Sequence, residues 1–210
     1  MLKNNYLLFI NKFLLLLLHN FKHLNIMEIK IGSKQMLKIL YILSWIIFIG
    51  LCIEAGGFIF NTIYTLFIDP AKTPQFWSEI DLSALYTFNA THFITQGSLI
   101  SIVAVLKAIL FYLIVKIIHD KKLDLAQPFN NATQRFVSNA AYLSIGIGLF
   151  SNWGANFAKW CTLQNVKMPT IESMHMDGSD VWLFMGIILL VIAQIFKRGI
   201  EIQTENELTV

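Results

Sequence analysis

Four long apolar segments constrain this sequence more than any other feature, because their lengths suit a helix that crosses a bilayer. They cover about residues 37–67, 97–118, 136–157 and 181–196. A bilayer core of about 30 Å needs roughly 20 helical residues. Charged residues make up only 14% of the chain, against about a quarter in soluble domains. The sequence therefore predicts an all-α integral membrane protein, a bundle of four membrane-spanning helices within the lipid bilayer.

Positive charges flank these segments unevenly, and this asymmetry predicts their orientation. If both termini are cytoplasmic, the inner flanks hold nine lysine or arginine residues and the outer loops hold three. The inner residues are Lys30, Lys34, Lys38, Lys116, Lys121, Lys122, Arg135, Lys197 and Arg198, and the outer ones are Lys72, Lys159 and Lys167. We therefore expect both termini on the cytoplasmic side.

The first 26 residues form a separate apolar leader. Its stretch NYLLFINKFLLLLLHNF is like a signal h-region, but no A-x-A-like cleavage site follows it. It could also be a fifth apolar segment, interrupted by Lys12, or translation could begin at Met27 or Met36. We accordingly divide the sequence into a leader, 1–26, and a four-span membrane domain, 27–210, with a cytoplasmic tail at 197–210.

Two ionisable residues, Glu54 and Lys107, lie inside the predicted spans, where such residues are functional candidates by default. Glu54 lies 16 residues from Lys38, about 24 Å along a helix. Lys107 lies nine residues from Lys116, about 14 Å. The two depths differ by roughly 10 Å, so this count does not favour a direct ion pair.

The third predicted span offers polar groups at the depth of Glu54. Asn152 lies 16 residues from Phe136, at the inner end of that span. Asn152, Asn156 and the indole of Trp153 could therefore hydrogen-bond the carboxylate. Two readings of Glu54 stay open: a structural polar group that holds helices together, or a group with a ligand, proton or gating role.

Several classes of function are disfavoured by the motifs. The sequence has no HExxH, no GxSxG, no Walker loop and no GxGxxG, so we expect no enzyme and no cofactor. The run Met174-His175-Met176-Asp177 contains residue types that bind metals, but four adjacent residues in an outer loop are a weak signal. We predict no metal site.

The predicted cytoplasmic face carries features that suit a protein partner. Leu125, Pro128 and Phe129 form an apolar group in the polar loop between the second and third spans. The C-terminal tail begins with two basic residues and then becomes acidic, which disfavours direct nucleic-acid binding. The tail candidates for docking are Lys197, Arg198, Glu201, Glu205 and Glu207.

Three stretches resemble one family of bacterial membrane proteins, the domain of unknown function 2975. They are KIGSKQMLKILYILSWIIFIGLCIEAGG, HDKKLDLAQPFN and VIAQIFKRGIEIQTENELTV, and the resemblance covers roughly 29–210. It implies four spans, the bacterial cytoplasmic (inner) membrane and no assigned catalytic residue. Members usually begin near the KIGSK-like segment, and their genes often neighbour a small helix-turn-helix regulator.

These observations lead to one functional hypothesis and two alternatives. The protein is expected to be a non-enzymatic regulator that engages a small helix-turn-helix transcription factor at the cytoplasmic face. Alternatively, it is a small transporter or channel component that uses Glu54 and Lys107. A third reading is an assembly subunit of a larger complex.

Overall fold

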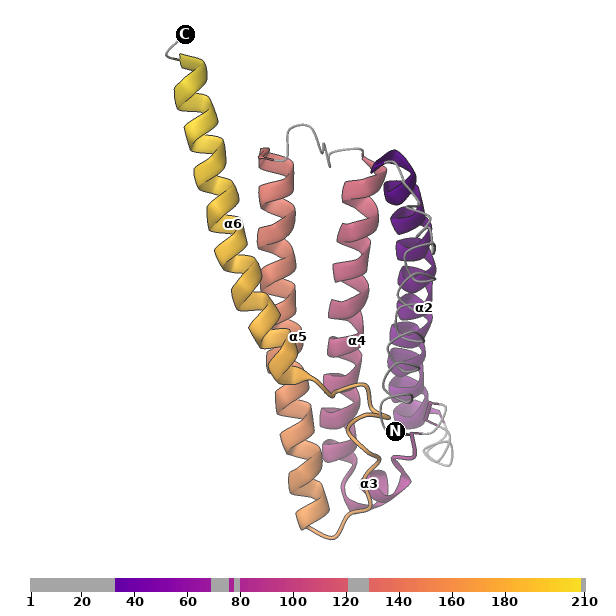
Figure 1. The fold of residues 1–210 in the computed structure, drawn as a ribbon. Coiled ribbons are helices and arrows are strands. Elements are labelled where there is room, and N and C mark those ends of the chain that lie inside the picture. The colour runs from indigo at the N-terminus through magenta and orange to yellow at the C-terminus, as the bar shows by residue number, and fades with distance from the viewer. Residues whose placement is uncertain (1–32, 69–75, 78–79, 121–128, 209–210) are drawn as a thin grey trace, which may run out of the picture. The chain divides into compact units, whose positions relative to one another are not determined.

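The computed structural model describes residues 33–68, 76–77, 80–120 and 129–208 (Figure 1). Within these ranges the regular structure is helical, apart from one isolated antiparallel bridge between Trp77 and Ile80. This confirms the all-α prediction. The helices are α2 (Ser33–Phe67), α3 (Ser83–Phe88), α4 (Ala90–His119), α5 (Asn131–Leu163) and α6 (Ser179–Leu208).

The chain divides into two compact units, Met1–Gln35 and Met36–Val210. The leader predicted at 1–26 lies outside the described residues. The second unit contains all four predicted spans, and each helix extends beyond the apolar segment that predicted it. The largest extension is at α6, which continues through the predicted tail to Leu208.

Asparagine residues begin two of the long helices. The side chain of Asn89 accepts a hydrogen bond from the Thr91 amide at the start of α4. Asn130 does the same for the Thr133 amide at the start of α5, at 2.8 Å. Such caps satisfy amides that have no partner within the helix. The local sequence therefore fixes where α4 and α5 begin.

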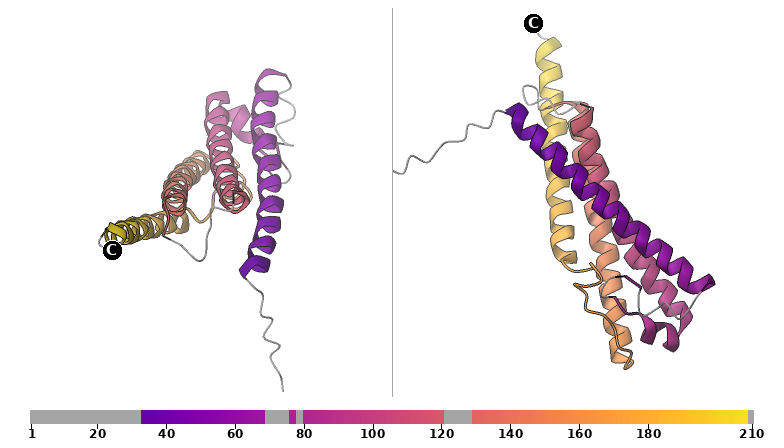
Figure 2. Two further views of the ribbon diagram at one scale, coloured as in Figure 1. Left: turned by 90° about the horizontal axis from the view of Figure 1, so that it is seen from above. Right: turned by 90° about the vertical axis from the view of Figure 1, so that its right-hand side faces the viewer.

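The long helices of the second unit follow one another side by side in chain order, with α5 between α4 and α6 (Figures 1 and 2). Glycines allow the close approach of α5 and α6. A Cβ atom on Gly148 would lie 2.6 Å from Leu183 Cγ, and one on Gly186 would lie 2.5 Å from Ile145 Cγ1. Small residues let membrane helices pack closely, so these two glycines allow α5 and α6 to lie close together.

Three described helices, α2, α4 and α6, are long and apolar enough to cross a membrane. The predicted third span, 136–157, lies within α5, which has 33 residues but is less apolar. Its central position explains this difference, because α5 packs against neighbours with small and polar residues such as Ser144 and Ser151, both buried. A helix shielded from lipid needs fewer large apolar residues.

The segment 164–178, here called the connecting segment, folds back along α5 before α6 begins (Figure 1). As a result, Ser179 lies beside Gly148, halfway along α5. Together with α3 and its neighbours, the connecting segment covers an apolar core. The buried members of this core from both segments are Phe76, Ile80, Leu82, Leu85, Val166, Met174 and Met176. We call this end of the unit the α3 end.

Candidate functional site

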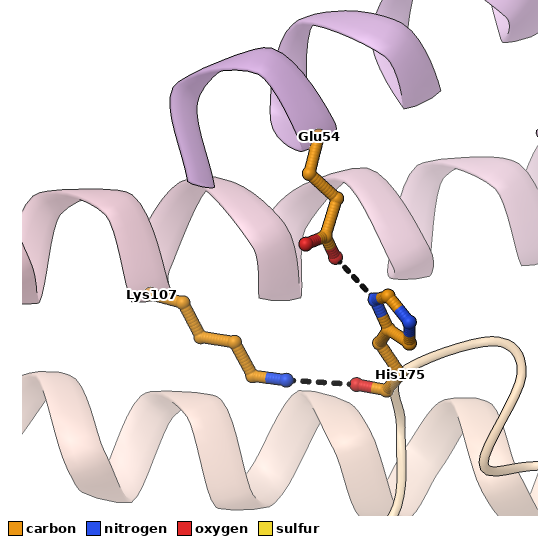
Figure 3. A network of polar contacts seen from close by, with 3 residues as sticks. All are labelled: Glu54, Lys107 and His175. Atoms are coloured by element: carbon orange, nitrogen blue, oxygen red, sulfur yellow. Dashed lines mark hydrogen bonds and ion pairs between the residues drawn. The ribbon is translucent and has the colours of Figure 1, made fainter. Parts of the chain in front are cut away.

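Glu54 on α2 and His175 on the connecting segment form the closest polar contact at the α3 end (Figure 3). Glu54 Oε1 lies 2.5 Å from His175 Nδ1. The Glu54 side chain is 19% exposed and that of His175 is 48% exposed. The carboxylate is therefore largely enclosed by protein, and the imidazole remains accessible on one side.

Lys107 of α4 is the third residue of this cluster, beside Glu54 and His175. Its ammonium Nζ donates to the carbonyl oxygen of His175 at 2.9 Å (Figure 3). It also interacts electrostatically with Glu54 and Asp177. Two different helices thus hold one residue of the connecting segment, one through its side chain and one through its backbone.

The backbone of the connecting segment presents His175 in an unusual conformation. Its φ is +55°, in the left-handed region that few residues other than glycine adopt. Two backbone hydrogen bonds enforce the turn: the His175 amide donates to Glu172 at 2.9 Å, and the Met176 amide donates to Ile171 at 3.1 Å. Strained residues often occur at functional sites, which makes His175 a candidate in its own right.

Gln96 of α4 holds the same turn from its buried side. Its Nε2 donates to the sulfurs of Met174 and Met176 at 3.4 and 3.5 Å, and all three residues are buried. Gly154 provides the space for Met176, since a Cβ atom there would lie 2.5 Å from the Met176 sulfur. The two methionines on either side of His175 therefore anchor the turn in the core.

The methionines and the histidine of the Met174-His175-Met176-Asp177 run face different partners. Glu54 contacts the imidazole, and Gln96 donates to the two sulfurs. The Lys107 ammonium donates to the backbone of the same turn. A cation beside this ammonium would be repelled. Among the described residues, there is also no group of three or more His, Cys, Asp or Glu side chains that could hold a metal ion.

The predicted partners of Glu54 on the third span were wrong. Asn156 Nδ2 donates to Asn152 Oδ1 at 3.3 Å, and both residues are exposed. Trp153 is also exposed and stacks on Phe150, with 6.4 Å between the ring centroids. These three residues are exposed on α5 and contact one another or Phe150, and counting residues along a helix cannot determine which face they occupy.

The space between the three polar residues of the cluster is also lined by apolar side chains, among them Phe58 and Val103. It is too small to hold a water molecule. In this closed arrangement the cluster can clamp the connecting segment to α2 and α4. Removal of either the Glu54 or the His175 side chain would weaken the clamp, since each supplies one partner of their contact.

The sequence reasoning missed His175 and Gln96 as members of this site. His175 was noted only within a metal-like run, whereas its partner is 121 residues away in the sequence. Gln96 precedes the predicted start of the second span at residue 97, so it lies outside the predicted intramembrane residues. A glutamine directly before an apolar span is the sequence signal that could have found it.

The residues predicted as docking candidates for a protein partner lie in the loop before α5 and at the C-terminal end of α6. Leu125 and Pro128 lie outside the described residues. Phe129 packs on α6, where its ring centroid lies 5.3 Å from that of Phe196 and its Cδ1 would lie 2.6 Å from a Cβ atom on Gly199. The candidates on the tail all lie on the last turns of α6, and they are Lys197, Arg198, Glu201, Glu205 and Glu207.

Comparison with protein families decides the relationship that the three sequence stretches indicated. The family model described as "Protein of unknown function (DUF2975)" matches residues 65–210. The chain belongs to this family. The DUF2975 match includes the second and third of these stretches, Lys107 and His175, whereas the first stretch, at 30–57 with Glu54, precedes it. No curated protein and no solved structure was found to match the chain.

Proposed function

We propose that this DUF2975 protein is a non-enzymatic regulator in the bacterial cytoplasmic membrane, with α2, α4, α5 and α6 as its four spans and both termini in the cytoplasm. The basic residues support this orientation. Lys38 lies in the second turn of α2, Lys116 in the last turn of α4, Arg135 in the second turn of α5 and Lys197 in the C-terminal half of α6. The first turns of α2 after Gln35, the last turns of α4, the first turns of α5 and the C-terminal half of α6 lie toward the end of the unit opposite α3 (Figure 1), as the positive-inside rule requires of a cytoplasmic face.

The observation that carries the regulator proposal is the continuity of α6. The helix starts at Ser179, four residues after His175, and runs without interruption to Leu208. A rigid helix transmits a displacement of one end to the other. Any change that releases His175 on the outer side would therefore shift or rotate the helix end on the cytoplasmic side.

The last turns of α6 offer the surface for a partner. Glu205 and Arg198 are exposed, and Arg198 Nη1 lies 3.0 Å from Glu201 Oε2. The neighbouring genes of relatives make a small helix-turn-helix regulator the expected partner. An acidic helix can bind the basic surface with which such a regulator contacts DNA, and it would thereby withdraw the regulator from its operator.

Affinity measurement tests this proposal. The full-length protein in lipid nanodiscs is titrated with the helix-turn-helix regulator encoded beside its gene. We expect binding by the unaltered protein and a loss of at least tenfold in affinity for the double variant Glu201→Lys and Glu205→Lys, because charge complementarity is reversed. The matched control is Glu172→Lys with Asp180→Lys, exposed residues of the connecting segment and of the first turn of α6, which makes the same change in net charge and should bind as the unaltered protein does.

Two results would contradict the regulator proposal. One is the absence of binding by the unaltered protein at micromolar concentrations. The other is an equal loss of affinity in the Glu172 and Asp180 control and the tail variant, which would show that net charge alone governs the contact.

The transporter alternative is favoured by one observation, the three polar groups from α2, α4 and the connecting segment that meet at one point. Intramembrane ionisable groups of this kind occur in proton relays. The alternative predicts a proton flux in liposomes that Glu54→Gln abolishes while the helical content is unchanged. If the unaltered protein conducts nothing, the alternative is wrong.

A further inference from the structure

A cleft lies between the last turns of α4 and the first turns of α5, at the end opposite α3. Its volume is about 470 Å³, within the range of small-ligand sites. One wall is apolar, and its larger residues are Leu113, Ile117 and Phe136. The cleft belongs neither to the Glu54 cluster nor to the end of α6.

Two cations line the polar part of this cleft, Lys116 from α4 and Arg135 from α5. Both side chains are exposed. Arg135 forms no ion pair or hydrogen bond with another described residue, and Lys116 Nζ lies 5.8 Å from the ring centroid of Tyr112. One carboxylate, Asp120, also lines the cleft, and it has interactions of its own. The lining thus carries an excess of positive charge.

The position of these groups within the helices gives the cleft an amphipathic character. Lys116 precedes the last residue of α4, His119, by about one turn, and Arg135 follows the first residue of α5, Asn131, by about one turn. With α4 and α5 as membrane spans, on which this inference rests, this level is where a membrane helix passes from hydrocarbon to headgroups. A molecule that fits both parts needs an anionic head and an apolar chain.

We infer that the cleft is a binding site for an anionic glycerophospholipid such as phosphatidylglycerol. The lipid phosphate binds between the Lys116 ammonium and the Arg135 guanidinium, and an acyl chain lies against Leu113, Ile117 and Phe136. Basic pockets between membrane helices are known to hold anionic headgroups, and guanidinium groups suit phosphate oxygens. This site goes beyond the proposed regulation, because it requires neither the partner nor the Glu54 cluster.

Native mass spectrometry of the full-length protein in detergent tests the inference, with phosphatidylglycerol titrated and occupancy recorded. Each basic group near a lipid phosphate contributes about a fivefold change in affinity. We therefore expect the double variant Lys116→Gln and Arg135→Gln to bind about 25-fold more weakly. The matched control is Lys159→Gln with Lys167→Gln, two exposed lysines near the α3 end, which makes the same change in net charge and should bind normally.

Three further arms distinguish the sources of the phosphate and the effect of folding. Glycerol 1-phosphate at millimolar concentration should displace little lipid, and zwitterionic phosphatidylethanolamine should bind several-fold more weakly. The charge-preserving pair Lys116→Arg and Arg135→Lys should restore binding if the glutamine variants lose it through charge rather than misfolding. Equal affinity of the glutamine variant and its control, full displacement by glycerol 1-phosphate, or failure of the charge-preserving pair to restore binding would each overturn the inference.

Discussion

The imidazole of His175 contacts the carboxylate of Glu54 at 2.5 Å, and this contact joins the connecting segment to α2 across 121 residues of sequence. The contact spans α2 and the segment that leads directly into α6. Helix α2, whose apolar segment is the least buried of the three span-length apolar helices, and helix α6 are therefore linked near the α3 end by one pair of side chains.

A double-mutant cycle on this pair should show coupling. We expect Glu54→Ala and His175→Ala each to lower the free energy of unfolding, and the double variant to lose less than their sum by about 1 kcal/mol. Unfolding is followed by steric trapping in bicelles. The parallel cycle of Glu54→Ala with Asn152→Ala should show no coupling. Coupling to Asn152 instead would restore the partner that was expected from sequence.

Removal of the Lys107 ammonium should loosen the connecting segment. In Lys107→Met the carbonyl of His175 loses its donor, and the loss of one hydrogen bond costs about 0.5–1.5 kcal/mol. Hydrogen exchange of the amides in the connecting segment should accelerate, while that of α6 beyond Gly186 changes little. Lys107→Arg retains a donor and serves as the control. Unchanged exchange in Lys107→Met would show that this hydrogen bond does not hold the turn.

Two glycines that look alike in the sequence should respond oppositely to alanine. Gly148→Ala places a methyl group against Leu183 Cγ at 2.6 Å and the Ser179 carbonyl oxygen at 2.9 Å, so α5 and α6 must separate. We expect a loss of about 1–3 kcal/mol. Gly50→Ala meets no atom within 4 Å, and it should leave stability unchanged or raise it by up to about 1 kcal/mol. Equal effects in thermal unfolding would argue against the close packing of α5 on α6.

The thiol of Cys161 should be protected in the folded protein. Cys161 lies near the end of α5, beyond the segment predicted to span, and its burial raises the pKa of the thiol. Fewer thiolates at neutral pH and a closed core both slow alkylation. In a Cys52→Ser background we expect maleimide to label Cys161 only after unfolding in detergent. Leu163→Cys, at an exposed position, is the control that labels in the folded state.

Part of the candidate site was accessible from sequence, and part was not. Glu54 and Lys107 stand out because charges in apolar segments are rare, and depth counting separated their backbones by roughly 10 Å along the helix axes. His175 bridges that separation, because its side chain contacts Glu54 and its carbonyl oxygen accepts from Lys107. Counting along straight helices could not find it, because the connecting segment folds back along α5.

The sequence by itself determined the helices, because apolar segments of span length and asparagine caps act locally, within a few turns. It also determined the uneven distribution of positive charge. Only the tertiary structure decided that α5 lies between α4 and α6, that α6 starts beside Gly148, and that His175 is the partner of Glu54. These features depend on which face of each helix meets a neighbour and on the path of the connecting segment. Both are set by packing between residues far apart in the chain, to which hydropathy and periodicity are insensitive.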